Sequence, residues 1–502
     1  MDDAALLDAV TPGTPPDAPM HMADKMPTRA AAFGVLLLSG SNAFRLTVQF
    51  LLFPVLARLL DPEDYGLIAL AMPVVLFAIT LGEGGMGPAL MRVPDPNGEV
   101  EATMFWTSLA TGIVCAAVLL LAAPLIATAL SHARIAPVLM SLAPVLLLSA
   151  AFGVPAVRIQ KSGATWIFAV GDVASTIAGA AVALFGALIG WGVWCLVAQQ
   201  LVVWSIKLAV LIGLAGIKVR AGPRRSSFRY LMRHGTPLVG SNLLTLLSNA
   251  IDALLIGRLL GVAQLGFYAL AYQIVRIPET VLNGPVVISF LPAVARLDAG
   301  PRAAIRMFLD ALRMMLTVSA PIMVGVALTA DLSVGLLLGP RWHDTALLLT
   351  ILAPPAIAQT LGYLSRALLL GRGRSNLQFG LALLNAALTL AGVLSGAPFG
   401  IVGIAVGVAV AVVLGNLAYI IAAMREAYVS FQALALALAP TLAAVTIMGC
   451  GVVGLRALLP AALSAWVSMV LAAGVGTTLY VSALRLLAPE AFAAAIFWRH
   501  GR

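Results

Sequence analysis

The most informative part of this sequence is residues 38–84, LSGSNAFRLTVQFLLFPVLARLLDPEDYGLIALAMPVVLFAITLGEG, because their pattern recurs without a gap 200 positions later. Of these 47 residues, 15 are identical to their partners in residues 238–284, so that Gly40-Ser41-Asn42 returns as Gly240-Ser241-Asn242. Composition alone would give identity at roughly a tenth of the positions. Both copies lie in strongly apolar sequence. We therefore interpret the chain as a duplicated membrane domain, which is how many secondary transporters are built.

The composition excludes a water-soluble globule. Of 502 residues, 61% are hydrophobic and 10% are charged, and the mean hydropathy is +1.02, which is typical of a polytopic membrane protein. The three cysteines stand alone in apolar runs and the five histidines have no metal-ligand spacing, so we expect neither a disulfide framework nor a metal or other cofactor. The cysteines are Cys115, Cys195 and Cys450.

Apolar windows of about 20 residues predict fourteen transmembrane helices in an all-α protein. Six precede a basic segment, at 31–60, 65–90, 103–130, 135–158, 164–189 and 191–216. Eight follow it, at 236–260, 265–295, 307–331, 345–369, 376–397, 400–424, 432–456 and 461–486. The predicted architecture is two six-helix lobes followed by two C-terminal helices.

The distribution of the 30 Lys and Arg residues predicts the orientation. With the N-terminus inside, twenty fall in cytoplasmic segments, five in external segments and five within spans. Because positive side chains near span ends are retained in the cytoplasm, this asymmetry places both termini there. An even number of helices separates the two copies of the repeat, so the copies cross the membrane in the same direction.

These patterns divide the chain into six parts. They are a disordered cytoplasmic tail at 1–28, an N-lobe at 29–216, a basic cytoplasmic linker at 217–234, a C-lobe at 235–425, helices 13 and 14 at 426–487, and a cytoplasmic tail at 488–502. The linker's arginines could form a patch for lipid headgroups or nucleic acid. We favour a topogenic linker that rests on anionic lipid.

Polar residues mark the predicted cavity. In helix 1, Asn42, Arg45 and Gln49 are spaced three and four apart and share one helical face. The repeat places a similar stripe on helices 7 and 8. Polar groups that faced lipid would cost several kcal/mol each, so we expect both stripes to line one wet cavity, and we leave open that some of them only hold helices together. The second stripe includes Asn242, Asn249, Gln273, Arg276 and Asn283.

Intramembrane carboxylates are candidates for carrying a coupling ion, because a charge within a span is functional by default. The candidates are Glu83, Asp172, Asp252 and Glu279. Glu279 lies three residues from Arg276, and the alternative for this pair is an internal ion pair at a helix kinked by Pro278. The sequence has no phosphate-binding Gly-x-x-x-x-Gly-Lys-[Ser/Thr] loop, so we expect an ion gradient or the membrane potential to drive the protein.

Two motif regions resemble the polysaccharide transporter family, which contains the Wzx-type flippases of the multidrug/oligosaccharidyl-lipid/polysaccharide superfamily. The first is the run from Ala57 to Leu67, ARLLDPEDYGL, with Gly85-Met86-Gly87-Pro88 after it. The second is Leu255–Gly261, LIGRLLG, with Leu265-Gly266-Phe267-Tyr268 after it. The resemblance implies two six-helix lobes around a cationic cavity.

The resemblance also implies a function, and this is not enzymatic. The expected substrate is an undecaprenyl-diphosphate-linked oligosaccharide, moved from the cytoplasmic to the periplasmic leaflet of a bacterial inner membrane for exopolysaccharide or lipopolysaccharide export. The implied partners are this substrate, membrane lipids, and polysaccharide polymerase and export proteins, with no nucleic acid. Arg45 and Arg276 would then bind anionic groups of the substrate. A cation-coupled multidrug exporter of the same superfamily and, more remotely, a membrane polysaccharide polymerase are the alternatives.

Overall fold

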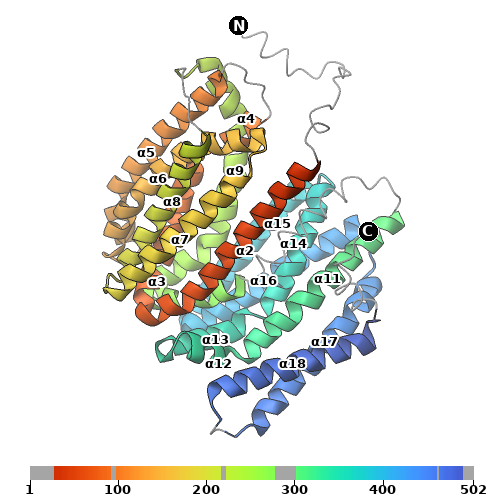
Figure 1. Ribbon diagram of the computed structural model, residues 1–502. Coiled ribbons are helices and arrows are strands. Elements are labelled where there is room, and N and C mark those ends of the chain that lie inside the picture. Colours follow the sequence, from red (N-terminus) through yellow and green to blue (C-terminus); the bar gives the residue numbers. More distant parts are fainter. Residues whose placement is uncertain (1–27, 92–97, 216–221, 277–300, 461–462, 490–502) are drawn as a thin grey trace. The chain divides into compact units, whose positions relative to one another are not determined.

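The computed structural model describes residues 28–91, 98–215, 222–276, 301–460 and 463–489. All regular structure within these ranges is helical (Figure 1), which confirms the predicted all-α class. Each of the fourteen predicted spans contains described helix. The two predicted tails fall almost entirely outside the described ranges.

The helices of the first half follow the predicted spans closely. They are α2 (Thr28–Leu59), α3 (Pro62–Glu83), α4 (Met86–Met91), α5 (Glu99–Ala129), α6 (Ile135–Ser162), α7 (Trp166–Leu188) and α8 (Val193–Ala215). The predicted span 65–90 is interrupted between α3 and α4, because Gly84 and Gly85 have φ values of 58° and 61°. Glycine adopts this left-handed conformation without strain.

The second half begins with α9 (Arg225–Leu259), which starts within the basic segment, and continues with helical residues 262–276. The remaining helices are α11 (Pro301–Leu328), α12 (Ala330–Leu337), α13 (His343–Leu352), α14 (Pro355–Gly371), α15 (Ser375–Gly396), α16 (Gly400–Glu426), α17 (Phe431–Leu458) and α18 (Ala465–Leu487). The segments on either side of Pro354 are bent by 51°, as expected where proline removes a backbone donor.

Many of these helices can cross a membrane. Within the described ranges, nine segments are long and apolar enough, or ten if the bent pair α13–α14 forms one span. One of the nine, Asn376–Glu426, contains both α15 and α16. These two helices pack closely against each other. A Cβ added to Gly392 would lie only 2.4 Å from the Gly407 carbonyl oxygen. The chain is a multi-pass membrane protein.

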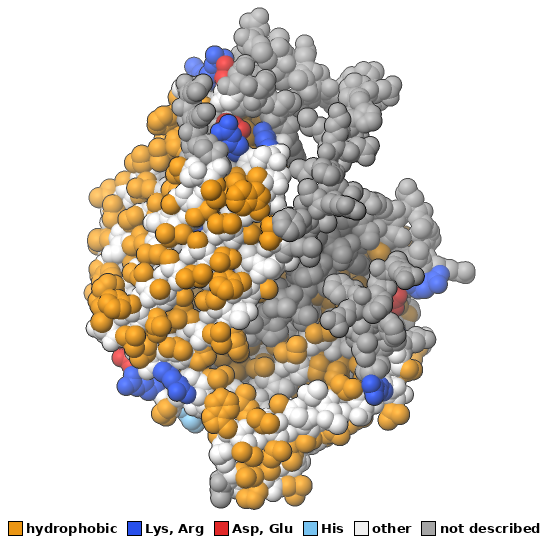
Figure 2. Space-filling view, in the orientation of Figure 1, with side chains coloured by type: hydrophobic (Ala, Val, Ile, Leu, Met, Phe, Trp, Pro, Cys, Tyr) orange, Lys and Arg blue, Asp and Glu red, His pale blue; other side chains and the backbone are white. Residues whose placement is uncertain are grey.

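The surface agrees with that conclusion. In the face shown in Figure 2, apolar side chains cover helices α5 to α8, whereas Lys and Arg side chains gather toward their ends. On α5, Leu121 is 79% exposed and Leu125 is 71% exposed. Such a continuous apolar surface is stable only in lipid.

The chain forms two compact units. Unit 1 comprises Met1–Leu56, Ala71–Thr128 and Ala133–Leu246, and unit 2 comprises Ala57–Leu70, Ala129–His132 and Leu247–Arg502. In unit 1, α8 packs against α6 and α7. In unit 2, α16 packs against α14 and α15, and α17 packs against α11 and α18. The connection between α2 and α3 therefore belongs to the unit that holds most of the second half.

Within unit 2, the two copies of the repeat touch at equivalent positions. A Cβ on Gly66 would lie 1.8 Å from the carbonyl oxygen of Val262, and a Cβ on Gly266 would lie 1.9 Å from that of Pro62. Positions 62 and 262 are partners in the repeat, and so are 66 and 266, so a local twofold relation connects the two contacts. Glycine is required because a side chain would prevent this approach. We call residues 57–70 and 257–270 the contact segments.

Trp342 connects both contact segments to the rest of unit 2. It is fully buried, and its Nε1–H donates to the Ala57 carbonyl oxygen at 2.7 Å. Its ring meets Tyr65 and Phe267 edge-on, with centroid distances of 5.4 and 5.8 Å. Arg58 adds hydrogen bonds to carbonyl groups at the C-terminal end of α12, where a cation also stabilises the helix dipole.

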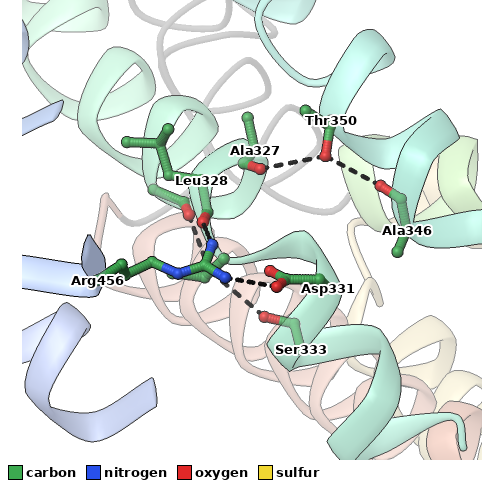
Figure 3. Close-up of polar contacts among 9 residues, drawn as sticks. Ala327, Leu328, Asp331, Ser333, Ala346, Thr350 and Arg456 are labelled. Carbon is green, nitrogen blue, oxygen red and sulfur yellow. Dashed lines mark hydrogen bonds and ion pairs between the residues drawn. The ribbon is translucent and has the colours of Figure 1, made fainter. Parts of the chain in front are cut away.

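Within unit 2, Arg456 connects α17 to the end of α11 and to α12 (Figure 3). This residue, in the last turn of α17, donates to the Leu328 carbonyl oxygen and pairs with the Asp331 carboxylate. Nearby, the Thr350 hydroxyl donates to the carbonyl oxygens of Ala327 at 3.3 Å and Ala346 at 3.0 Å. The ends of α11 and α17 are thereby held together by one arginine.

Candidate functional site

A polar cavity of about 220 Å³ lies within unit 1, between α2, α7 and α8. Its lining residues recur at helical spacing, so that each helix turns one polar stripe toward the same space. They are Arg45, Val48, Gln49, Leu52, Ser175, Thr176, Ala180, Gln199, Gln200, Val203 and Lys207. The predicted stripe residues Arg45 and Gln49 thus share one cavity, which we call the polar cavity.

Two cations contribute to the polar cavity. The Lys207 Nζ lies 2.8 Å from the Asp172 Oδ1, and the two side chains are 23% and 29% exposed. The Arg45 Nη2 donates to the Asn42 Oδ1 at 2.7 Å. The buried Arg45 Nε has no hydrogen-bond partner among the described residues. Because one carboxylate pairs with one of the two cations, the described lining retains an excess of positive charge.

The remaining polar lining can also donate hydrogen bonds. Three glutamines and two hydroxyl residues, Ser175 and Thr176, surround the cations. Amide and hydroxyl groups can donate to oxygen atoms, and an arginine fork matches the geometry of phosphate or carboxylate. The chemistry of this cavity therefore suits an anionic ligand rich in oxygen.

A second polar cluster lies in unit 2 around Asp252 of α9. Asp252 is 8% exposed, and its carboxylate accepts from the Tyr268 hydroxyl at 2.7 Å and from the Ala253 backbone N–H at 2.8 Å. The Tyr268 and Tyr272 rings stack at 5.9 Å, and the Arg276 guanidinium lies 6.0 Å from the centre of the Tyr272 ring. Since residues 268, 272 and 276 are spaced by four, they form one helical stripe. We call this group the aspartate cluster.

The other predicted site residues are distributed as follows. Asn242 is exposed on α9, and Gln273 is half-buried on helix 262–276. Asn249 lies on α9, but its side chain is not among those described. Glu83 is the last residue of α3. It is exposed and does not line the polar cavity. Glu279 and Asn283 lie outside the described residues.

Several polar residues within the helices were not among the site residues predicted from the sequence. Lys207 is an intramembrane cation, and Gln199-Gln200 interrupts an apolar run, so both signals were present in the sequence. Arg366 of α14 is a third case. Its Nη2 donates to the Asn416 Oδ1 at 3.1 Å, and its guanidinium lies 4.4 Å from the centre of the Tyr419 ring. This arginine is held by an amide and an aromatic face inside unit 2.

Comparison with protein families decides the relationship of the chain. A family model described as "Polysaccharide biosynthesis protein" matches residues 55–347, more than half of the sequence. The chain belongs to this family. The match includes both contact segments. The family sequence pattern therefore covers the place where the repeats touch.

Two known proteins resemble this chain over 63% and 70% of its length. It is 27% identical over 323 residues to the succinoglycan biosynthesis transport protein ExoT of Rhizobium meliloti (strain 1021), a match that covers 63% of this chain and 64% of ExoT. It is 22% identical over 355 residues to the lipopolysaccharide biosynthesis protein WzxC of Escherichia coli (strain K12), covering 70% of each chain. The chain thus spans just under two thirds of ExoT.

Solved structures show the same fold. The lipid II flippase MurJ in an inward closed conformation matches with a TM-score of 0.73 at 11% identity, covering 91% of this chain and 99% of MurJ. An inward-facing multidrug resistance MATE family transporter of the MOP superfamily matches with a TM-score of 0.60 at 15% identity, covering 76% and 94%. At these identities the comparison establishes the fold alone, which is that of a multi-span transporter.

Proposed function

We propose that this protein is a flippase that moves an undecaprenyl-diphosphate-linked oligosaccharide from the cytoplasmic to the periplasmic leaflet of a bacterial inner membrane. The translocated glycan serves exopolysaccharide or lipopolysaccharide export. Both termini lie in the cytoplasm, as the distribution of Lys and Arg indicates. The observation that carries the proposal is the excess positive charge of the polar cavity, where Arg45 and Lys207 lie among hydrogen-bond donors, in a fold that matches a lipid II flippase over 91% of the chain.

Recognition of the substrate rests on its diphosphate. A diphosphate presents several anionic oxygen atoms, which charge-assisted hydrogen bonds from arginine match in geometry and charge. Arg45 lines the polar cavity, so its guanidinium group can donate to substrate oxygens. Gln49 and Gln199 would bind sugar hydroxyls, because amides both donate and accept.

Transport proceeds by alternating access between the two predicted lobes, 29–216 and 235–425. The contact segments form the periplasmic closure in this proposal, since Arg58 and Arg258 are two of the five basic residues that the sequence assigns to the external ends of spans. Opening toward the periplasm separates Gly66 from Val262 and Gly266 from Pro62. Moving an anion outward across a membrane that is negative inside releases about 2.3 kcal/mol per charge per 100 mV.

The carboxylates are the proposed coupling groups. Asp172 pairs with Lys207, and Asp252 accepts from Tyr268, so each is held by one side-chain donor whose loss would leave an intramembrane charge. Such a charge is expensive in lipid and favours uptake of a cation. Glu83 and Glu279 are further candidates for the same role.

A cation-coupled multidrug exporter is the second candidate, because the fold also matches a MATE transporter with a TM-score of 0.60. An exporter of organic cations needs unpaired carboxylates in its cavity. In the polar cavity the neighbouring carboxylate, Asp172, is already paired with a lysine. The charge balance therefore favours the flippase. A membrane polysaccharide polymerase is the third and weakest candidate.

Deletion of the gene followed by lipid analysis tests these alternatives. For a flippase, the deleted cells accumulate a lipid-linked oligosaccharide in the cytoplasmic leaflet, where an externally added glycosidase does not reach it, and their drug sensitivity is unchanged. Accumulation of a single repeat unit in the outer leaflet indicates a polymerase. Increased drug sensitivity without lipid accumulation indicates an exporter. Re-expression of the wild-type chain controls for loss of neighbouring genes.

A further inference from the structure

A groove of about 440 Å³ in unit 1 lies outside the polar cavity, between α5 and the start of α9. Its lining is mostly apolar and includes two aromatic rings. The lining residues are Trp106, Thr107, Ala110, Thr111, Val114, Pro223 and Phe228. Trp106 is 44% exposed and Phe228 is 43% exposed. The groove is open at the surface, and we call it the basic groove for the residues described below.

The depth of the groove follows from its positions along α5, which begins at Glu99. At a rise of about 1.5 Å per residue, Trp106 lies about 10 Å from the charged start of the helix, and Val114 lies about 12 Å further along. Tryptophan concentrates at the boundary between headgroups and hydrocarbon. The groove therefore extends from the headgroup region into the region of the acyl chains.

The mouth of the groove is fixed by Arg224. Its Nη1 lies 2.7 Å from the Glu99 Oε2, and its backbone N–H donates to the Thr103 Oγ1 at 3.0 Å. These bonds attach the start of α9 to the start of α5. Because Arg224 is paired with a carboxylate, its role is to hold the two helices that form the walls.

Two further arginines are exposed on α9, on either side of the groove residue Phe228 in the sequence. Arg225 and Arg229 are one helical turn apart on α9. At 3.6 residues per turn they lie about 60° and 100° around the helix axis from Phe228. Positive charge thus stands beside the aromatic wall, at the end of the groove that lies at the headgroup level.

We propose that the basic groove is a binding site for one anionic phospholipid, with its phosphate on Arg225 and Arg229 and an acyl chain between Trp106 and Phe228. Charge complementarity selects an anionic headgroup. The apolar depth of the groove selects a lipid over a nucleic acid, which has no chain to bury there. The site is independent of the transported substrate and gives the basic linker a specific ligand.

Quenching of tryptophan fluorescence by brominated lipids tests the site on the full-length protein. Wild type and Trp106→Phe are reconstituted in brominated phosphatidylglycerol or brominated phosphatidylcholine, and the difference between the two proteins reports the lipid at Trp106. Each basic side chain near an anionic surface raises binding by about five-fold, so we expect a preference for phosphatidylglycerol of about five-fold or more. Trp466, which is 57% exposed on α18, is the matched control. The difference between wild type and Trp466→Phe reports quenching at Trp466, and this quenching should be about equal in the two lipids.

The variant R225Q/R229Q should bring the ratio at Trp106 to about one, whereas Arg425→Gln, an exposed arginine on α16, should leave it unchanged. If the double variant does not fold, wild type in 1 M NaCl replaces it, because salt at that concentration screens charges beyond about 3 Å and should remove the preference. Equal quenching by the two lipids at Trp106 in low salt overturns the proposal. So does a preference that survives both R225Q/R229Q and 1 M NaCl.

Discussion

The contact segments and the polar stripes are two parts of the same repeat, and they have diverged to very different extents. From position 57 to 71, seven of fifteen residues equal their partner 200 positions later, at 58, 59, 60, 66, 69, 70 and 71. From 43 to 57, one of fifteen does, Leu46. Arg45, Gln49 and Leu52 stand opposite Thr245, Asn249 and Asp252. The repeat is preserved where its copies touch, whereas the side chains at positions 45, 49 and 52 differ between the copies, although Asn42 and Asn242 are identical.

The physical reason is that the two parts obey different constraints. A twofold contact between backbones demands the same small residue on both sides, so Gly66 and Gly266 are required together. In our proposal the polar stripes bind an asymmetric ligand, for which the two copies need not carry the same groups. We propose that packing maintained the symmetry of the contact segments, whereas ligand binding removed it from the polar stripes. The predictions below test this division.

Arg45→Thr, which restores the symmetry of the stripe, should have the largest effect. It removes the guanidinium from the polar cavity and should lower polysaccharide export by about ten-fold or more, because charge-assisted hydrogen bonds contribute about 1.5–3 kcal/mol each. Export is measured in deleted cells that express the variant, normalised to the amount of protein in the membrane. Arg372→Thr, an exposed arginine after α14, is the control. Normal export by Arg45→Thr would remove Arg45 from the substrate path.

Gly66→Ala and Gly266→Ala should each destabilise the protein. The added methyl meets a backbone carbonyl that cannot rotate away, and overpacking of this kind costs about 1–3 kcal/mol. Thermal unfolding in detergent should show a similar loss for both variants, since the two contacts are related by the repeat. A large effect from one variant and none from the other would argue against the twofold contact.

Trp342→Phe should have a smaller effect than the glycine changes. It retains the aromatic packing against Tyr65 and Phe267 and loses the hydrogen bond to Ala57, which contributes about 0.5–1.5 kcal/mol. The same unfolding measurement applies, with Trp466→Phe at the exposed surface as the control. If Trp342→Phe were as stable as Trp466→Phe, the hydrogen bond to Ala57 would not hold the first contact segment.

Gly40→Ala and Gly240→Ala should have the smallest effect, and of opposite sign. These glycines are also identical in the two copies, but a Cβ on either meets nothing within 4 Å. Alanine favours helix over glycine by up to about 1 kcal/mol, so both variants should unfold at the same or a slightly higher temperature. Marked destabilisation would show that identity in the repeat alone, without close packing, predicts the cost of substitution.

Much of the fold could be predicted from the sequence, because the membrane imposes a length and an apolarity on every span. The break between α3 and α4 and the bend at Pro354 lie within predicted spans, and Gly84-Gly85 and Pro354-Pro355 were local signals for both. The candidate site was harder to predict. Arg45 and Gln49 line the polar cavity together with Lys207 and Gln199. The repeat could not identify Lys207 and Gln199, because they lie on a helix outside the matching window.

The sequence by itself determined the duplication, the helical class, the spans and the intramembrane charges, since each follows from periodicity, apolarity or identity along one chain. The tertiary structure decided which of those charges have partners. Asp172 pairs with Lys207 on the next helix, and Asp252 accepts from Tyr268, sixteen residues away. It also decided that Gly66 meets Val262 and that Gly266 meets Pro62. These contacts depend on distances between helices, which periodicity along one helix does not specify.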